Sequence, residues 1–154
     1  MVHYVTGDLL KSDCKFVCHQ VNCQKKMGSG IAKQIREKWQ AVYDMYMMVS
    51  EPNQLGHIQR VYIQDPIVGI RGVVNMFAQE NYGYDGRRYT SYDAFWSCLG
   101  EIKDQIQKGN KIGFPDHIGC GLGGANWEVI RTMIEEVLGE DYEVYIYKLE
   151  EETI

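Results

Sequence analysis

Four glycines within six residues stand between a short apolar run and a helix with apolar periodicity. The segment Ile118-Gly-Cys-Gly-Leu-Gly-Gly124 follows the run 111–114, and the helix begins near Asn126. A glycine-rich turn between a strand and a helix lets backbone N–H groups approach an anion, and the helix N-terminus favours negative charge. The segment therefore predicts a phosphate or diphosphate site. It is not a Walker loop, because no Gly-Lys-Ser/Thr follows, and it lacks the Gly-x-Gly-x-x-Gly of a dinucleotide-binding unit.

A second strand-to-helix turn has a similar form. His19-Gln-Val-Asn22 ends an apolar run, and Gly28-Ser-Gly-Ile-Ala32 opens the next helix. A third segment, Gly7-Asp8-Leu9, adds a carboxylate at the end of the first strand. Open α/β sheets commonly bind ligands in a crevice at the carboxyl ends of their strands. The three segments together predict a crevice that holds one ligand from both sides.

The elements that must position these turns alternate along the chain. The apolar patterns predict strands at 2–6, 16–21, 57–64, 72–78, 111–115 and 142–148, and helices at 30–38, 40–50, 91–108 and 127–138. Thr90 or Ser91 and then Asn126 are suitable N-caps for the last two helices, and Gly139 ends the last one. This alternation predicts an α/β fold whose largely parallel sheet has helices on both faces.

Composition limits the classes of function. The chain has 154 residues, which fits one domain over 1–154, and 45% hydrophobic with 24% charged residues is ordinary for a soluble globular protein. A net charge of −5 argues against nucleic-acid binding as the main activity. No signal peptide and no apolar run of membrane-spanning length is present, so we expect a cytoplasmic protein without a membrane partner.

Five cysteines, at positions 14, 18, 23, 98 and 120, form no C-x-x-C pair, and their odd number argues against a disulfide framework. Cys14, Cys18, His19 and Cys23 could suggest zinc. However, Cys18 lies in an apolar strand, and buried cysteines are common. We therefore expect no metal and no cofactor.

In these motifs the chain resembles the macro domain family, whose members bind ADP-ribose. The matching segments are Gly7–Leu9, His19–Cys23, Met27–Ala32 and Ile118–Gly124 followed by Trp127. The segment 75–93 is similar to one subgroup, which holds small bacterial and phage proteins related to ADP-ribose 1″-phosphate phosphatases and terminal ADP-ribose protein glycohydrolases. The resemblance covers about residues 2–149 and implies a three-layer α/β/α macro domain with a mixed, largely parallel sheet.

The resemblance also implies where ADP-ribose lies. Adenine is expected near Asp8, the diphosphate over the two glycine-rich turns, and the distal ribose near Asn22 and Gln79. The residues expected to bind the ligand are Asp8, Leu9, Asn22, Met27, Gly28, Ser29, Gly30, Ile31, Phe77, Arg88, Gly119, Cys120, Gly121, Leu122, Gly123, Gly124 and Leu149. Simpler roles remain open, since Asp8 and Asn22 are also suitable turn residues. The loop 79–89 is expected to close over the distal ribose and to supply an arginine to phosphate, although it can also be an exposed connection whose charges are solvated.

The residues expected to take part in catalysis are Asn22, His19, Gln79 and Asn126. His19 matches a histidine of the phosphatase-like relatives, but its apolar surroundings equally fit a core histidine. The glycohydrolase relatives use a lysine after the fourth strand, which the segment 75–79 lacks. They also use an aspartate where this chain has Gly123, and phage-like relatives have one at Asn126. A lysine-dependent covalent route is therefore not expected.

Three hypotheses about function follow. The first is a hydrolase that removes a substituent, a phosphate or a protein or nucleic-acid linkage, from the distal ribose 1″ position by water attack without a metal. The second is a non-catalytic reader of ADP-ribose, and the third a nucleotide-binding scaffold of another specificity. The expected partner is ADP-ribose or an ADP-ribosylated substrate, with nucleic acid bound only if ADP-ribosylated, and the expected state is a monomer.

Overall fold

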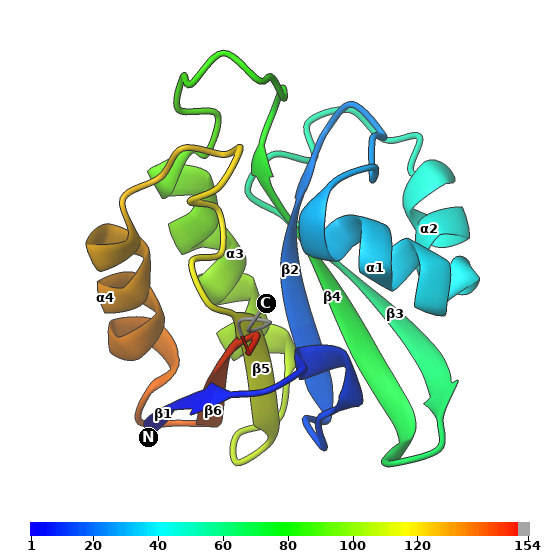
Figure 1. The fold of residues 1–154 in the computed structure, drawn as a ribbon, viewed down its shortest axis with the longest axis vertical. Helices are drawn as coiled ribbons and strands as arrows, with labels where there is room; N and C mark the ends of the chain where they lie inside the picture. The colour runs from blue at the N-terminus through cyan, green and yellow to red at the C-terminus, as the bar shows by residue number, and fades with distance from the viewer. Residues whose placement is uncertain (151–154) are drawn as a thin grey trace.

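A computed structural model describes residues 1–150. Within them six strands form one sheet in the order β1-β6-β5-β2-β4-β3 (Figure 1). The strands are β1 (Val2–Thr6), β2 (Phe16–Asn22), β3 (Ile58–Asp65), β4 (Gly69–Gln79), β5 (Lys111–Pro115) and β6 (Glu143–Lys148). Every neighbouring pair is parallel except β3 with β4, which is antiparallel. The predicted mixed, largely parallel sheet is confirmed.

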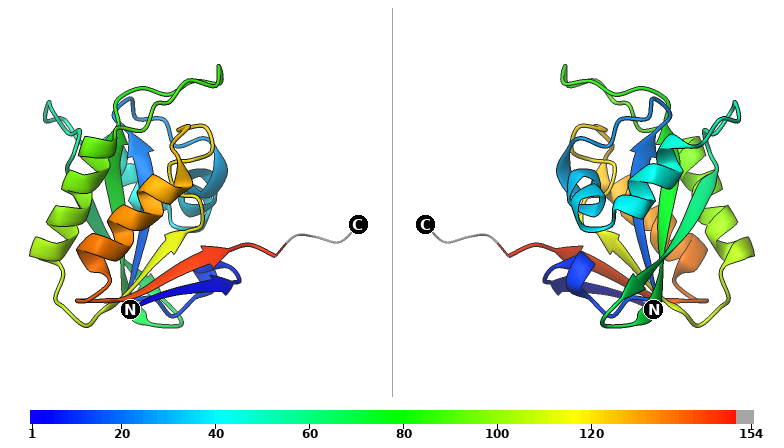
Figure 2. Two further views of the ribbon diagram at one scale, coloured as in Figure 1. Left: turned by 90° about the vertical axis from the view of Figure 1, so that its left-hand side faces the viewer. Right: turned by 90° about the vertical axis from the view of Figure 1, so that its right-hand side faces the viewer.

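Helices cover both faces of the sheet. Helices α3 (Tyr92–Gln105) and α4 (Trp127–Leu138) lie on one face, and α1 (Gly30–Lys38) and α2 (Gln40–Met47) lie on the other (Figure 2). The α3 and α4 side chains Phe95, Leu99, Ile130 and Ile134 pack into one core cluster. Ile35, Trp39 and Val42, from α1, α2 and their junction, belong to a second cluster. The fold is therefore the predicted three-layer α/β/α arrangement.

The predicted helices 30–38 and 127–138 and the predicted strands 2–6 and 111–115 have the predicted bounds, whereas the remaining elements differ from prediction by one to three residues at one or both ends. The predicted helix 91–108 ends at Gln105, because Ile106 is extended and a turn through Gly109 (φ +89°) leads into β5. Strand β4 begins at Gly69, three residues before the predicted start, because the hairpin extends the β3 ladder to the pair Asp65–Gly69. Asp65 closes that hairpin by accepting from the Ile67 and Val68 N–H groups.

The parallel strands bring the predicted turns together. Strands β1, β6, β5, β2 and β4 all run in the same direction, so the loops after them open at one edge of the sheet. A short 3-10 helix, η1 (Leu9–Lys11), follows β1 at that edge. None of the helices in the described part of the chain combines the length and the hydropathy that crossing a membrane requires.

Candidate functional site

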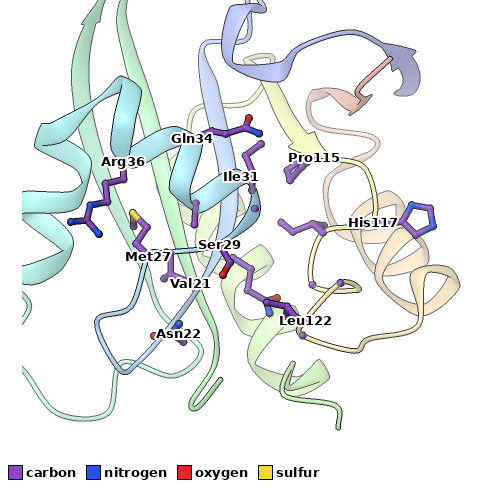
Figure 3. Close-up of a pocket in the computed structure, with 18 of the residues that line it drawn as sticks. Val21, Asn22, Met27, Ser29, Ile31, Gln34, Arg36, Pro115, His117 and Leu122 are labelled. Carbon is purple, nitrogen blue, oxygen red and sulfur yellow. The ribbon is translucent and has the colours of Figure 1, made fainter. Parts of the chain in front are cut away.

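A cleft of about 950 Å³ lies at this edge of the sheet (Figure 3). This volume falls within the range of small-molecule sites. Most predicted ligand-binding residues line it: Asp8, Leu9, Asn22, Met27, Gly28, Ser29, Gly30, Ile31, Gly119, Gly121, Leu122, Gly123 and Leu149, together with Gln79. The cleft thus collects side chains and backbone from the loops after β1, β2, β4, β5 and β6.

The glycine-rich loop after β5 lines the cleft and has unpaired backbone N–H groups. Within residues 1–150, the N–H groups of Gly121, Leu122 and Gly123 donate to no protein acceptor. Two of its glycines differ in their surroundings. A Cβ at Gly123 would lie 2.4 Å from Thr90 Oγ1 and 2.5 Å from the Gly119 oxygen, whereas a Cβ at Gly121 would meet nothing within 4 Å. Gly123 is therefore required by packing, and Gly121 borders open space.

The N-terminus of α1 also lines the cleft. Its N-cap residue Ser29 makes no side-chain cap hydrogen bond, unlike Ser91 of α3 and Asn126 of α4. The N–H groups of Gly30 and Ile31 belong to the first helical turn, where no intrahelical acceptor exists. An uncapped helix start and a loop with unpaired amides together favour an anion between them.

The end of β2 and the end of β4 are joined by a polar side-chain network. Gln20 Nε2 donates to Gln79 Oε1 at 2.8 Å and to Thr90 Oγ1 at 2.7 Å. Gln79 Nε2 donates to the Asn81 oxygen. Gln20 lines the cleft and was missed by the sequence analysis, although it belongs to the polar strand end that the analysis singled out. The network fixes the position of the predicted site residue Gln79.

Asn22 lines the cleft but uses its amide to hold its own loop. Its Oδ1 accepts from the Gln24 and Lys26 N–H groups, and its Nδ2 donates to the Lys26 oxygen. The Tyr46 hydroxyl lies 3.0 Å from the same Oδ1. Asn22 therefore shapes the turn after β2, which is the simpler of the two roles that the sequence left open.

Asp8 combines a structural role with a place in the cleft. Its Oδ1 accepts from the Leu10 N–H at 2.9 Å and caps η1. Its second oxygen, Oδ2, has no hydrogen bond within residues 1–150, so it can accept one from a ligand. The turn role and the predicted ligand contact are thus compatible in one carboxylate.

His19 was predicted at the site but lies in the core. The ring is fully buried, and Nε2 contacts Asn75 Oδ1 at 2.5 Å. Asn75 in turn donates to Gln59 Oε1, which extends the network to β3. Burial lowers the pKa of His19 to about 4. The apolar strand that carries His19 is covered on both faces, which explains why the ring does not reach the cleft.

Five further predicted residues do not line the cleft: Phe77, Arg88, Cys120, Gly124 and Asn126. Phe77 is buried against Tyr46, and Asn126 caps α4 by accepting from the Glu128 N–H. Arg88 stacks over the Tyr92 ring at 4.4 Å and does not line the cleft, so the expected arginine contact to phosphate stays a prediction. The loop 79–89 instead supplies Tyr82 and Tyr84 to the cleft.

Cys120 and Gly124 belong to the glycine-rich loop but support it from outside the cleft. The Cys120 Sγ lies near the Ile118 oxygen, and burial raises the pKa of this thiol to about 11. Gly124 packs on the backbone of Arg87, where a Cβ would lie 2.8 Å from the carbonyl oxygen. Within residues 1–150, no three His, Cys, Asp or Glu side chains form a group that could hold a metal ion.

No protein-family model matches the chain. Among curated proteins, it is 25% identical over 152 residues to the DNA ADP-ribosyl glycohydrolase of Thermus aquaticus, a match that covers 96% of this chain and 41% of that protein. It is also 25% identical over 154 residues to the human ADP-ribose glycohydrolase OARD1, covering 96% of this chain and 91% of that protein. The chain therefore spans about two fifths of the bacterial relative.

Solved structures share the fold over nearly the whole chain. A Bacteroides thetaiotaomicron protein of unknown function has a TM-score of 0.82 and 28% identity, covering 97% of this chain and 98% of that one. The macrodomain of Thermus aquaticus DarG has a TM-score of 0.77 and 24% identity, covering 98% and 99%. Thermosipho africanus DarTG in complex with ADP-ribose has a TM-score of 0.81 and 18% identity, covering 99% and 43%.

Proposed function

We propose that this chain is a macrodomain whose cleft binds ADP-ribose, and that the protein hydrolyses a bond at the 1″ position of the distal ribose. One observation carries the binding proposal. The unpaired N–H groups of the loop 121–123 and the uncapped start of α1 line the same cleft. Two sets of amide donors suit a diphosphate, whose charge they stabilise without a basic side chain.

The remaining parts of ADP-ribose fit the two ends of the cleft. Asp8 and Leu149 line one end, where the Asp8 Oδ2 can accept from the adenine amino group. Gln79 and Tyr82 line the other end, next to the end of β2, and suit the distal ribose. The solved Thermosipho africanus relative that contains ADP-ribose supports this assignment of the ligand.

Hydrolysis is supported by the relatives, which are named glycohydrolases. In this chain, the amides of the two glycine-rich turns hold the diphosphate, and the network of Gln20, Gln79 and Thr90 fixes the distal end. Water then attacks C1″, the bond from C1″ to the leaving oxygen or nitrogen breaks, and the leaving group takes a proton. Catalysis by positioning is the contribution that these residues can make.

A specific observation favours a second candidate, a reader that binds ADP-ribose without turnover. Within the described residues, the carboxylates that line the cleft are Asp8 and Asp116. Asp8 follows β1 and Asp116 follows β5, and both lie on the Asp8 side of the cleft. Among the described residues that line the cleft, no carboxylate lies beside Gln79 at the distal end. A general base for water attack is therefore not supplied by an Asp or Glu side chain at the distal end.

We predict that free ADP-ribose binds with micromolar affinity or better, about −8 kcal/mol. Turnover is measured as release of free ADP-ribose from ADP-ribose 1″-phosphate, an ADP-ribosyl-glutamate peptide and ADP-ribosylated DNA. Release from any of these supports the hydrolase and identifies its leaving group, phosphate included. If ADP-ribose binds but none of the three substrates releases it, the reader replaces the hydrolase. If ADP-ribose does not bind, both candidate functions are overturned.

A substitution at Asp8 tests the adenine end. Asparagine is as effective a helix N-cap as aspartate. The substitution Asp8→Asn therefore keeps an oxygen that accepts from the Leu10 N–H, but it places an NH₂ group at the position of Oδ2. We expect a loss of about 1–3 kcal/mol in ADP-ribose binding, because the adenine amino group then meets a donor. Titration calorimetry with ADP-ribose and its hypoxanthine analogue measures this. Equal binding of both bases by the unmodified protein would show that Asp8 does not contact the amino group.

A further inference from the structure

One residue of the loop after β4 holds two carbonyl oxygens of the glycine-rich loop after β5, which lies beside it (Figure 1). The Thr90 hydroxyl donates to the Gly119 oxygen at 2.8 Å, and the Thr90 N–H donates to the Gly123 oxygen at 3.0 Å. The Tyr89 N–H donates to the same Gly123 oxygen at 2.8 Å. Thr90 is 2% exposed and does not belong to the cleft lining. It therefore contacts the loop and not the space for the ligand.

The glycine-rich loop has no side chains where Thr90 packs against it. A Cβ at Gly123 would lie 2.4 Å from the Thr90 Oγ1, and a Cβ at Gly119 would lie 3.2 Å from the same atom. The Gly119 oxygen also accepts from the Ala125 N–H at 3.0 Å. Both carbonyl groups are therefore engaged by the protein, and neither is free to turn its partial negative charge toward an anion in the cleft.

The same hydroxyl is connected to the end of the cleft that we assign to the distal ribose. A glutamine amide has two N–H donors, and those of Gln20 go to Thr90 Oγ1 and Gln79 Oε1. The Gln20 Oε1 is buried without a hydrogen-bond partner among the described residues. Reversing the Gln20 amide would break both bonds, so the amide keeps this orientation although one buried acceptor stays unpaired.

From these contacts we infer that Thr90 is a positioning residue for both halves of the cleft. It fixes the diphosphate-binding form of the loop 118–124 directly, and it fixes Gln79 through Gln20. An isolated antiparallel bridge between Gln79 and Thr90 also joins the two ends of the loop after β4. This inference rests on the proposed function, because it assigns the two halves to the diphosphate and the distal ribose. Removing the Thr90 hydroxyl should therefore weaken both subsites, whereas removing the Gln20 amide should weaken only the distal one.

The test compares ADP-ribose with ADP, which lacks the distal ribose, by titration calorimetry. Thr90→Val should weaken both ligands at least ~10-fold, because it releases the Gly119 carbonyl and leaves a Gln20 N–H without an acceptor. Thr90→Ser keeps the hydroxyl and should bind both ligands as the unmodified protein does. Gln20→Met should weaken ADP-ribose at least ~5-fold and leave ADP unchanged, since Thr90 can still donate to Gly119.

Thr132→Val is the matched control. Thr132 also donates its hydroxyl to a backbone oxygen, that of Glu128, but it lies on α4 outside the cleft lining. This variant should change neither affinity, and thermal unfolding shows whether each variant is folded. The inference is overturned if Thr90→Val binds both ligands as Thr132→Val does, or if Thr90→Ser loses as much affinity as Thr90→Val.

If Thr90→Val does not fold, Gln20→Met decides the question. No loss of affinity in Gln20→Met, or an equal loss for ADP and ADP-ribose, then overturns the inference. If the unmodified protein does not bind ADP-ribose, the proposed function fails instead.

Discussion

Gly121→Glu should abolish ADP-ribose binding and leave the fold intact. The Cβ added at this position meets no atom within 4 Å, so the side chain enters the open cleft without disturbing its neighbours. It would place a carboxylate beside the unpaired N–H groups of Leu122 and Gly123, where the diphosphate is proposed to bind. Repulsion and steric exclusion should reduce the affinity by at least ~100-fold, or about 2.7 kcal/mol.

The measurement is titration calorimetry with ADP-ribose, accompanied by thermal unfolding of each variant. Gly100→Glu is the matched control, because Gly100 lies in α3, away from the cleft, and a Cβ there also meets nothing within 4 Å. Both variants should unfold near the temperature of the unmodified protein, and only Gly121→Glu should lose the ligand. Undiminished affinity in a folded Gly121→Glu variant would remove the loop 118–124 from the site.

The loops around the cleft could be predicted because backbone chemistry leaves a clear signal in the sequence. Glycine clusters that follow apolar strands indicate turns with accessible amides, and parallel strands bring such turns to one edge. The segments Gly28–Ile31 and Gly119–Gly123 are therefore where the sequence analysis placed them. The order of the strands and the antiparallel pairing of β3 were not predicted, because they depend on contacts between distant segments.

The directions of individual side chains were harder to predict. His19, Arg88 and Asn126 have the residue types of a reactive site, yet each is engaged elsewhere: by Asn75, by the Tyr92 ring and by the start of α4. The contact between Arg36 and Tyr43 was not predicted either, because it joins α1 to α2 across the helix break at Trp39. A motif thus locates a loop, whereas packing decides which of its side chains reach the ligand.

His19 should make the free energy of unfolding fall as the pH drops from about 6.5 to about 4. Asn75 uses its NH₂ group on Gln59, so its oxygen accepts from the His19 Nε2–H, and Nδ1 is buried without a partner. A proton on Nδ1 would place a charge and an unpaired donor in the core. The pKa therefore falls from 6.5 to about 4 in the folded protein, chiefly through burial.

Because the unfolded chain takes up the proton first, this contribution is complete above pH 6.5 and is lost as the pH falls to about 4. The expected loss is about 3 kcal/mol for a shift of this size. Urea unfolding at several pH values measures it, with His19→Gln as the comparison, since glutamine can donate to Asn75 but does not titrate. The unmodified protein should lose more stability than the variant over this range. Parallel curves for the two proteins would mean that His19 is not held neutral in the core.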